Sequence, residues 1–257
     1  MLHACRELLR RGVRPGILSR GYKARGGAGN DEALLLRRNL PEVPHVQDPD
    51  RFAGGMTLAG EVDCFVLDDG FQHLPLHRDE NVVLVDATDP FGGGFCPPAG
   101  RLRESPRALE RATLVVITRC ELIDRARLGE IMRRLRGLTP APIADSSFRA
   151  ACTPSLAGVR VLAACGIGNP RAFLATVQAL GAEIGDTRVF PDHHAYDARD
   201  AEALARAALP VVVTEKDAVK LEPLWRGPAP LRVVTQEFCA GEGGGGIAAM
   251  LDRLVRR

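Results

Sequence analysis

The chain alternates short apolar runs with longer segments whose apolar residues recur at helical spacing. Runs such as Val82–Val85, Leu114–Ile117 and Val159–Ala164 have the length and composition of buried strands. Between such runs, Glu121–Leu138 and Arg171–Leu180 carry the periodicity of amphipathic helices. Strands that alternate with helices predict an α/β fold with a mostly parallel sheet and helices on both of its faces.

The same pattern predicts further elements along the whole chain. The remaining helices are expected from the first residues to Gly12, and at Ala33–Arg38, Asp50–Leu58, Ala198–Ala208 and Ile247–Arg257. The remaining strands are expected at Ile17-Leu18, Val43–Val46, Cys64–Leu67, Arg188–Phe190, Leu209–Val213 and Leu231–Val234. Glycine-rich loops are expected at Arg25–Gly29 and Gly241–Gly246. A linker expected at Phe148–Val159 divides the chain into two domains, 1–148 and a smaller 149–257.

The formal charges nearly cancel, with 34 Lys and Arg residues against 32 Asp and Glu residues and a net charge of +2. A balance this even argues against nucleic acid as a partner. Basic residues do gather in three places, at Arg6–Arg14, Arg133–Arg136 and Arg253–Arg257. Such runs are typical of solvated helix faces, with contact to anionic lipid headgroups as the alternative.

The seven cysteines form no C-x-x-C pair, and several lie in apolar runs. This pattern indicates reduced thiols in a cytosolic protein, and it argues against a disulfide framework or a zinc site. No apolar run approaches the length of a transmembrane helix, and arginines interrupt the N-terminal segment. We therefore expect neither a membrane span nor a signal peptide.

The stretch Cys64–His73 reads CFVLDDGFQH. Its apolar run ends in two carboxylates, Asp68 and Asp69, which are costly at the end of a buried strand unless a cation or hydrogen-bond donors meet them. Ligands of open α/β sheets bind at the carboxyl ends of the strands. The pair therefore indicates a Mg²⁺–nucleotide site, but a helix N-cap followed by a turn glycine explains the same residues equally well.

Polar clusters follow other expected strands as well, at Ser19-Arg20, Asp86 and Thr214–Asp217. The acids are interleaved with cations along the chain, namely Arg20, Lys23, Arg101, Arg103 and Lys216. Phosphoryl transfer needs both signs of charge, because carboxylates hold Mg²⁺ and cations neutralise the moving phosphate. The recurrence of these clusters indicates a ligand-binding edge of the sheet.

For two further candidate catalytic sites, the local sequence favours a structural role over a catalytic one. Asp31 or Glu32 is placed to take a proton from an attacking hydroxyl, yet acids at a helix start more often act as caps. His193-His194 lacks the nearby ligands that zinc requires, and no G-x-S-x-G accompanies it. A loop histidine bonded to backbone is favoured there over one that assists a base or contacts phosphate.

Seven motifs occur in a fixed order along the chain. They are S-R-G-Y-K at Ser19–Lys23, N-D-E-A at Asn30–Ala33, L-D-D-G-F-Q-H at Leu67–His73, P-A-G-R-L-R-E at Pro98–Glu104, G-I-G-N-P at Gly166–Pro170, F-P-D-H-H at Phe190–His194 and T-E-K-D-A-V-K-L at Thr214–Leu221. Through these motifs the chain resembles the tetraacyldisaccharide 4'-kinase family of lipid A biosynthesis. Seven ordered motifs are far more specific than a lone G-x-G-x-x-G.

The resemblance implies a P-loop-type kinase core over 1–148 and a smaller C-terminal α/β domain over 149–257. It implies ATP- and Mg²⁺-dependent transfer of the γ-phosphate to the 4'-hydroxyl of tetraacyldisaccharide 1-phosphate, a lipid A precursor, giving lipid IVA. It also implies peripheral contact with the cytoplasmic face of the inner membrane. The alternative is a non-catalytic remnant of the family that binds acylated sugar or nucleotide.

The resemblance assigns roles residue by residue. Asp31, with Glu32 beside it, matches the family's base, which polarises the sugar hydroxyl, and His193 matches the catalytic histidine that supports the base. Asp68 and Asp69 match the acids that hold Mg²⁺. We expect nucleotide contacts from Gln72, His73 and Lys216. We expect substrate contacts from Ser19, Arg20, Tyr22, Arg101 and Arg103.

The chain departs from the family pattern in three places. Asn30 stands where the family usually has glycine, which is mild because Asn tolerates left-handed backbone, and Arg101 stands where it usually has proline. No G-x-x-x-x-G-K-[ST] loop, which would cradle the phosphates and bind Mg²⁺, occurs before the first helix. We therefore expect the chain as written to be inactive or very weakly active. We also expect a gap in the sheet where the family's first strand would lie, and we favour a start upstream of Met1 over an inactive relative.

Overall fold

The computed structural model describes residues 1–21, 31–242 and 245–256, so the expected loop at Arg25–Gly29 lies outside the described residues. The chain forms two compact units, each built from more than one segment. Unit 1 comprises Met1–Arg20, Val46–Arg149 and Phe238–Arg257, and unit 2 comprises Gly21–His45 and Ala150–Glu237. One crossing between the units, at 149/150, adjoins the boundary predicted at 148/149. The chain also crosses between the units after Arg20, His45 and Glu237. A division into two contiguous domains does not include these three crossings.

Unit 1 contains parallel strands and the helices that cover them. Its helices are α1 (Leu2–Arg10), α3 (Arg51–Met56), α4 (Arg125–Arg136) and α8 (Gly245–Val255), with 3-10 turns η2 (Pro106–Arg111) and η3 (Cys120–Leu122). Its strands are β1 (Pro15–Ser19), β3 (Cys64–Leu67), β4 (Val82–Asp86) and β5 (Leu114–Thr118), and β2 (His45–Gln47) lies at its boundary. The strand orders are β2-β1-β3 and β4-β5-β6, where β6 (Ile143–Cys152) continues into unit 2.

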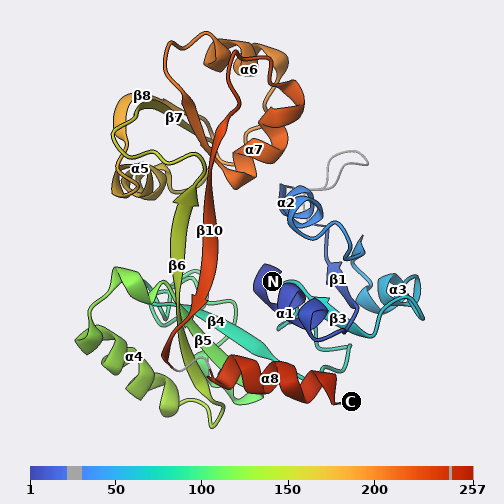
Figure 1. Ribbon diagram of the computed structural model, residues 1–257. Helices are drawn as coiled ribbons and strands as arrows, with labels where there is room; N and C mark the ends of the chain where they lie inside the picture. The colour runs from blue at the N-terminus through green and yellow to red at the C-terminus, as the bar shows by residue number, and fades with distance from the viewer. Residues whose placement is uncertain (22–30, 243–244, 257) are drawn as a thin grey trace. The chain divides into compact units, whose positions relative to one another are not determined.

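Strand β5 shows how helices cover both faces of the sheet in unit 1 (Figure 1). Its residues Leu114 and Val116 pack with Leu8 of α1 and with apolar side chains of α8. The alternate residues, Val115 and Ile117, pack on the other face with side chains of α4. Because successive side chains of a strand point to opposite faces, a continuous apolar run is what a strand buried on both sides requires.

Unit 2 is a second α/β layer structure. Its helices are α2 (Asp31–Asn39), α5 (Pro170–Ala179), α6 (Ala198–Ala205) and α7 (Glu215–Leu221), followed by the 3-10 turn η4 (Glu222–Leu224). Its strands are β7 (Arg160–Cys165), β8 (Glu183–Val189), β9 (Val211–Thr214) and the first part of β10 (Arg232–Ala240). The order is β10-β9-β7-β8, with β9–β10, β7–β9 and β7–β8 all parallel.

Strand β7 is buried between two helical layers in unit 2 (Figure 1). Val161 and Ala163 pack against Phe173 and Val177 of α5. Leu162 and Ala164, on the opposite face, pack against α6 and α7. The predicted mostly parallel α/β fold is therefore confirmed.

The predicted linker at Phe148–Val159 is wrong over its first part, because β6 extends to Cys152. The polar composition of β6 conceals the strand in the sequence. Ser146 is nevertheless buried, and its hydroxyl donates a 3.0 Å hydrogen bond to the backbone oxygen of Ile117. A buried polar side chain is tolerated where such a partner is supplied. Strand β8 likewise begins at Glu183, well before the predicted Arg188, and its side chains are largely exposed.

The helices in the described part of the chain include none that combines the length and the apolar character needed to cross a bilayer.

Replacing Leu204, a buried α6 side chain, tests the packing of unit 2. We expect Leu204→Ala to lower the free energy of unfolding by about 2–5 kcal/mol, because the truncated side chain leaves a cavity. Urea unfolding followed by the fluorescence of Trp225, the sole tryptophan, reports on this core because Trp225 packs against it. The exposed Val189 is the control, and Val189→Ala should cost less than about 1 kcal/mol. Equal losses in the two variants would contradict the packing described here.

Candidate active site

The carboxyl ends of three parallel strands in unit 2 supply the loops of the candidate site. Gly166 follows β7, the segment Asp192–Tyr196 follows β8, and Thr214 ends β9. Helix α7 begins directly after Thr214, whose side-chain oxygen accepts a 3.1 Å hydrogen bond from the backbone N–H of Asp217 and so caps the helix. This is the edge at which open α/β sheets bind ligands.

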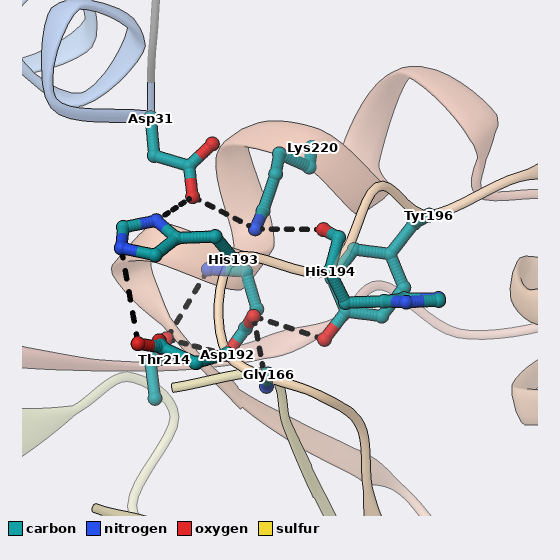
Figure 2. A network of polar contacts seen from close by, with 9 residues as sticks. Asp31, Gly166, Asp192, His193, His194, Tyr196, Thr214 and Lys220 are labelled. Carbon is teal, nitrogen blue, oxygen red and sulfur yellow. Dashed lines mark hydrogen bonds and ion pairs between the residues drawn. The ribbon is translucent and has the colours of Figure 1, made fainter. Parts of the chain in front are cut away.

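Asp31 and His193 meet at this edge although 162 positions separate them in sequence (Figure 2). The Nδ1 atom of His193 lies 3.2 Å from Oδ2 of Asp31. The ammonium of Lys220 donates a 3.0 Å hydrogen bond to the same oxygen. Asp31 is the first residue of α2, and Arg38 near the other end of that helix pairs with Glu222 at 2.6 Å. The structure thus gathers a carboxylate, an imidazole and an ammonium from three separate segments.

The protonation of Asp31 follows from these neighbours. Only 19% of its side chain is exposed, and burial by itself would raise the pKa of the carboxyl. The hydrogen bonds from Lys220 and His193 outweigh burial and hold the pKa of Asp31 below its ordinary value of 3.8. Asp31 is therefore an ionised carboxylate at neutral pH, able to accept a further hydrogen bond.

The backbone of His193 adopts a left-handed conformation with φ of 58°, which is uncommon for a residue other than glycine. Its N–H donates a 3.2 Å hydrogen bond to the backbone oxygen of Gly166, which ties the two loops together. The Nε2 atom lies 3.9 Å from Oδ2 of Asp192, on the side of the ring away from Asp31. Strained backbone of this kind is found where a loop must aim a functional side chain.

A fully buried carboxylate, Asp217, holds the loops behind the site. Its Oδ1 accepts a 3.1 Å hydrogen bond from the N–H of Gly166 and a 2.9 Å bond from the hydroxyl of Tyr196. Its Oδ2 accepts a 2.7 Å bond from the hydroxyl of Thr214. Burial, together with the charge of Asp217, raises the pKa of Tyr196, so the phenol stays protonated and donates. Three loops are therefore fixed to the start of α7.

The second histidine of the pair, His194, has structural contacts. Its Nε2 atom lies 2.8 Å from Oδ2 of Asp200 in α6. Its ring stacks on Phe190 and meets Tyr196 edge to face. Neighbouring histidines thus point to different partners, and only His193 contacts Asp31.

The predicted acidic pair lies in unit 1, at the end of β3. The N–H of Asp68 donates a 2.8 Å hydrogen bond to Leu18 of the adjacent β1. Asp69 has φ of 51°, and its Oδ2 lies 2.5 Å from the guanidinium of Arg103. The amide of Gln72 donates a 2.9 Å bond to Glu104, the residue after Arg103. The motifs L-D-D-G-F-Q-H and P-A-G-R-L-R-E are therefore in direct contact.

The other predicted site residues of unit 1 lie around the same loops. Ser19 ends β1 and is buried, with its hydroxyl 3.4 Å from the amide nitrogen of Gln47. Arg20 follows on the surface, and Arg101 forms an ion pair with Asp89. The backbone N–H of His73 donates a 3.0 Å hydrogen bond to Gly70. Tyr22 lies outside the described residues.

The donor set of the acidic pair determines which cation it suits. Among residues 1–21, 31–242 and 245–256, no group of three or more His, Cys, Asp or Glu side chains is arranged to hold a metal ion. Asp68 and Asp69 nevertheless offer carboxylate oxygens, the donors that Mg²⁺ prefers. Mg²⁺ in kinases takes only one or two carboxylates, and phosphates and waters complete its octahedron. The pair fits such a partial site.

Lys220 and Tyr196 contribute to the unit 2 site but were not among the predicted site residues, and Asp217 was predicted only as part of the polar cluster Thr214–Asp217. The predicted Lys216 lies on the first turn of α7. The spacing of Asp217 and Lys220, three apart on one helix, was the available signal, because residues so spaced share a face. Glu32 is exposed on α2, beside Asp31.

Comparison with known protein families places these motifs in one family. A family model described as tetraacyldisaccharide-1-P 4'-kinase matches residues 1–254. The tetraacyldisaccharide 4'-kinase of Anaeromyxobacter dehalogenans strain 2CP-C is 39% identical over 264 residues, covering 89% of this chain and 70% of the relative. That of Syntrophus aciditrophicus strain SB is 36% identical over 255 residues, covering 83% and 68%.

One solved structure is similar over nearly the whole chain. It is LpxK from Aquifex aeolicus in complex with ATP, with a TM-score of 0.78 and 25% sequence identity. The similarity covers 99% of this chain and 82% of that one.

Proposed function

This chain belongs to the tetraacyldisaccharide-1-P 4'-kinase family, and we propose that it transfers the γ-phosphate of ATP to the 4'-hydroxyl of tetraacyldisaccharide 1-phosphate. The product is lipid IVA, in lipid A biosynthesis. The observation that carries the proposed mechanism is the ionised carboxylate of Asp31, held between His193 and Lys220. An alcohol is a poor nucleophile and gains from a base positioned against its proton.

Asp31 accepts the hydrogen of the 4'-hydroxyl in this mechanism. Both of its contacts, with His193 and with Lys220, end on Oδ2 (Figure 2). Within the described part of the chain no side chain forms a hydrogen bond or ion pair with Oδ1, which is the oxygen left for the sugar. The hydroxyl donates to Oδ1, and its oxygen attacks the γ-phosphorus. As the new P–O bond forms, the bond from the γ-phosphorus to the bridging oxygen breaks, ADP leaves, and the proton moves to the carboxylate. His193 keeps the carboxylate in place, and 54% of its side chain is exposed.

Asp68 and Asp69 would hold Mg²⁺ against the phosphates of ATP. The bound ion supplies charge neutralisation at the phosphate oxygens. Arg103 then has two roles, because it pairs with Asp69 and can turn to a phosphate oxygen. Gln72, His73 and Lys216 are proposed to contact the nucleotide, and Ser19, Arg20, Tyr22, Arg101 and Arg103 the substrate. ATP as donor is supported by the complex of the Aquifex aeolicus relative.

We also propose that the chain works at the cytoplasmic face of the inner membrane through peripheral contact. The acyl chains of the substrate are insoluble in water and remain in the bilayer. Helix α3 exposes two large apolar side chains four residues apart, Phe52 at 63% and Met56 at 58%. Residues with this spacing share one helix face, and exposed apolar side chains of this size favour an interfacial contact.

Substitution of Asp31 tests the proposed base. We expect Asp31→Asn to lower the rate of phosphate transfer by a factor of about 100 to 10,000, because the amide cannot take the proton. Single-turnover transfer of labelled γ-phosphate to the acylated disaccharide measures the chemical step even when it is slow. The control is Glu202→Gln, which changes an exposed carboxylate paired with Arg206 on α6 and should leave the rate unchanged. An unchanged rate in Asp31→Asn would remove Asp31 as base. Disaccharide binding without any transfer by the unsubstituted chain would support a binding protein.

Substitution of the acidic pair tests the Mg²⁺ site. We expect Asp68→Asn and Asp69→Asn each to raise the Mg²⁺ concentration that gives half-maximal transfer by about tenfold or more, because each removes a charged ligand. The measurement is transfer rate against Mg²⁺ concentration at fixed ATP. Asp124→Asn is the matched control, since Asp124 caps α4 and Asn is an equally good cap. A Mg²⁺ dependence identical to that of the control would rule the pair out as ligands.

A further inference from the structure

Lys220 is a largely enclosed cation of the unit 2 site. Only 10% of its side chain is exposed. Its ammonium donates 3.0 Å hydrogen bonds to Oδ2 of Asp31 and to the backbone oxygen of His194. It also lies 5.3 Å from the centre of the Tyr196 ring, within cation–π range. A lysine ammonium has three donors, and two of them are used to join α2 to the loop that carries both histidines.

The helix that carries Lys220 is itself fixed to that loop. Asp217, one turn earlier on α7, is fully buried and accepts hydrogen bonds from Gly166 and from Tyr196. Asp217 and Lys220, on one face of α7, therefore both form hydrogen bonds with the 193–196 segment. Because the helix cannot shift without breaking the buried Asp217 bonds, the position of the Lys220 ammonium is set by the fold.

The charges around Asp31 leave a specific task for Lys220. Among the described residues, the groups nearest Asp31 are Lys220 from α7 and His193 from the loop, with Asp192 beyond His193 and Glu32 adjacent on α2. Two of these neighbours are acids, and a triphosphate would bring further negative charge. Burial and these negative charges disfavour the charged form of Asp31, and a cation in contact with the carboxylate opposes both effects.

We propose that Lys220 is a positioning residue that keeps the Asp31 carboxylate charged and holds its Oδ2 beside His193, so that Oδ1 faces the acceptor hydroxyl. This inference rests on the proposed function of Asp31 as base. Lys220 touches neither the hydroxyl nor the phosphate in this account. It acts through Asp31, and its removal should change how Asp31 titrates as well as how fast phosphate is transferred.

The titration of Asp31 can be followed without turnover. In the chain labelled with ¹³C at aspartate carboxyls, the Asp31 resonance is the one lost in Asp31→Asn. We expect Lys220→Met to raise the pKa of Asp31, because burial remains and the strongest opposing contact is gone. Lys220→Arg should keep the pKa below 3.8, since the charge remains. Arg206→Met, which removes an exposed cation directly after α6, should leave the titration unchanged. An unchanged pKa in Lys220→Met would overturn the proposal.

Transfer kinetics separate positioning from simple anchoring. We expect Lys220→Met to lower the single-turnover rate by about tenfold or more at neutral pH. The acid limb of its pH–rate profile should move to higher pH. Lys220→Arg should restore most of the rate and most of the profile. A uniform loss at every pH, with the acid limb in place, would mean that Lys220 only anchors the helix. Lys220→Gln serves as a second neutral variant if the methionine variant does not fold. If the unsubstituted chain transfers no phosphate but the Asp31 titration shifts as expected, the proposed function fails and the positioning of Asp31 by Lys220 stands.

Discussion

The burial of one carboxylate, Asp217, is the constraint on which the unit 2 site depends. A buried charge is tolerated only when donors surround it, and three loops supply them through Gly166, Tyr196 and Thr214. Satisfying Asp217 therefore fixes the chain after β7, the chain after β8 and the start of α7 relative to one another. His193 is then aimed by the fixed loop, and Lys220 by the fixed helix. The contact with Asp31 follows from both.

Most of the fold could be predicted from hydrophobic pattern, and the exceptions have physical reasons. Strands β5, β7 and β9 are apolar on both faces because helices cover both sides, so their sequences are unmistakable. Strand β8 is an outer strand with mostly exposed side chains. Strand β6 contains buried polar residues whose hydrogen bonds are satisfied, such as Ser146. Neither strand has an apolar run to detect. The return of Gly21–His45 to unit 2 depends on tertiary packing, which no local pattern encodes.

The site was only partly visible in the sequence. The local sequence predicts that Asp31 is an acid at the start of a helix, and Asp31 is the first residue of α2. The structural interpretation and the proposed catalytic role therefore apply to the same residue. Its contact with His193 spans 162 positions, and only the resemblance of ordered motifs suggested it. Lys220 was overlooked because helical spacing shows that Asp217 and Lys220 share a face but not what that face meets. The Asp68-Asp69 pair was found because two acids at a strand end are conspicuous wherever they occur.

The central claim is that Asp31 and His193 act as one unit in phosphate transfer. A double-mutant cycle with Asp31→Asn and His193→Gln, measured as single-turnover rates on the acylated disaccharide, tests it most directly. Groups that act as a unit are not additive, because once Asp31 is lost there is no base for His193 to support. The account predicts that the double variant is no slower than the slower single variant. Rate losses that multiply in the double variant would contradict it.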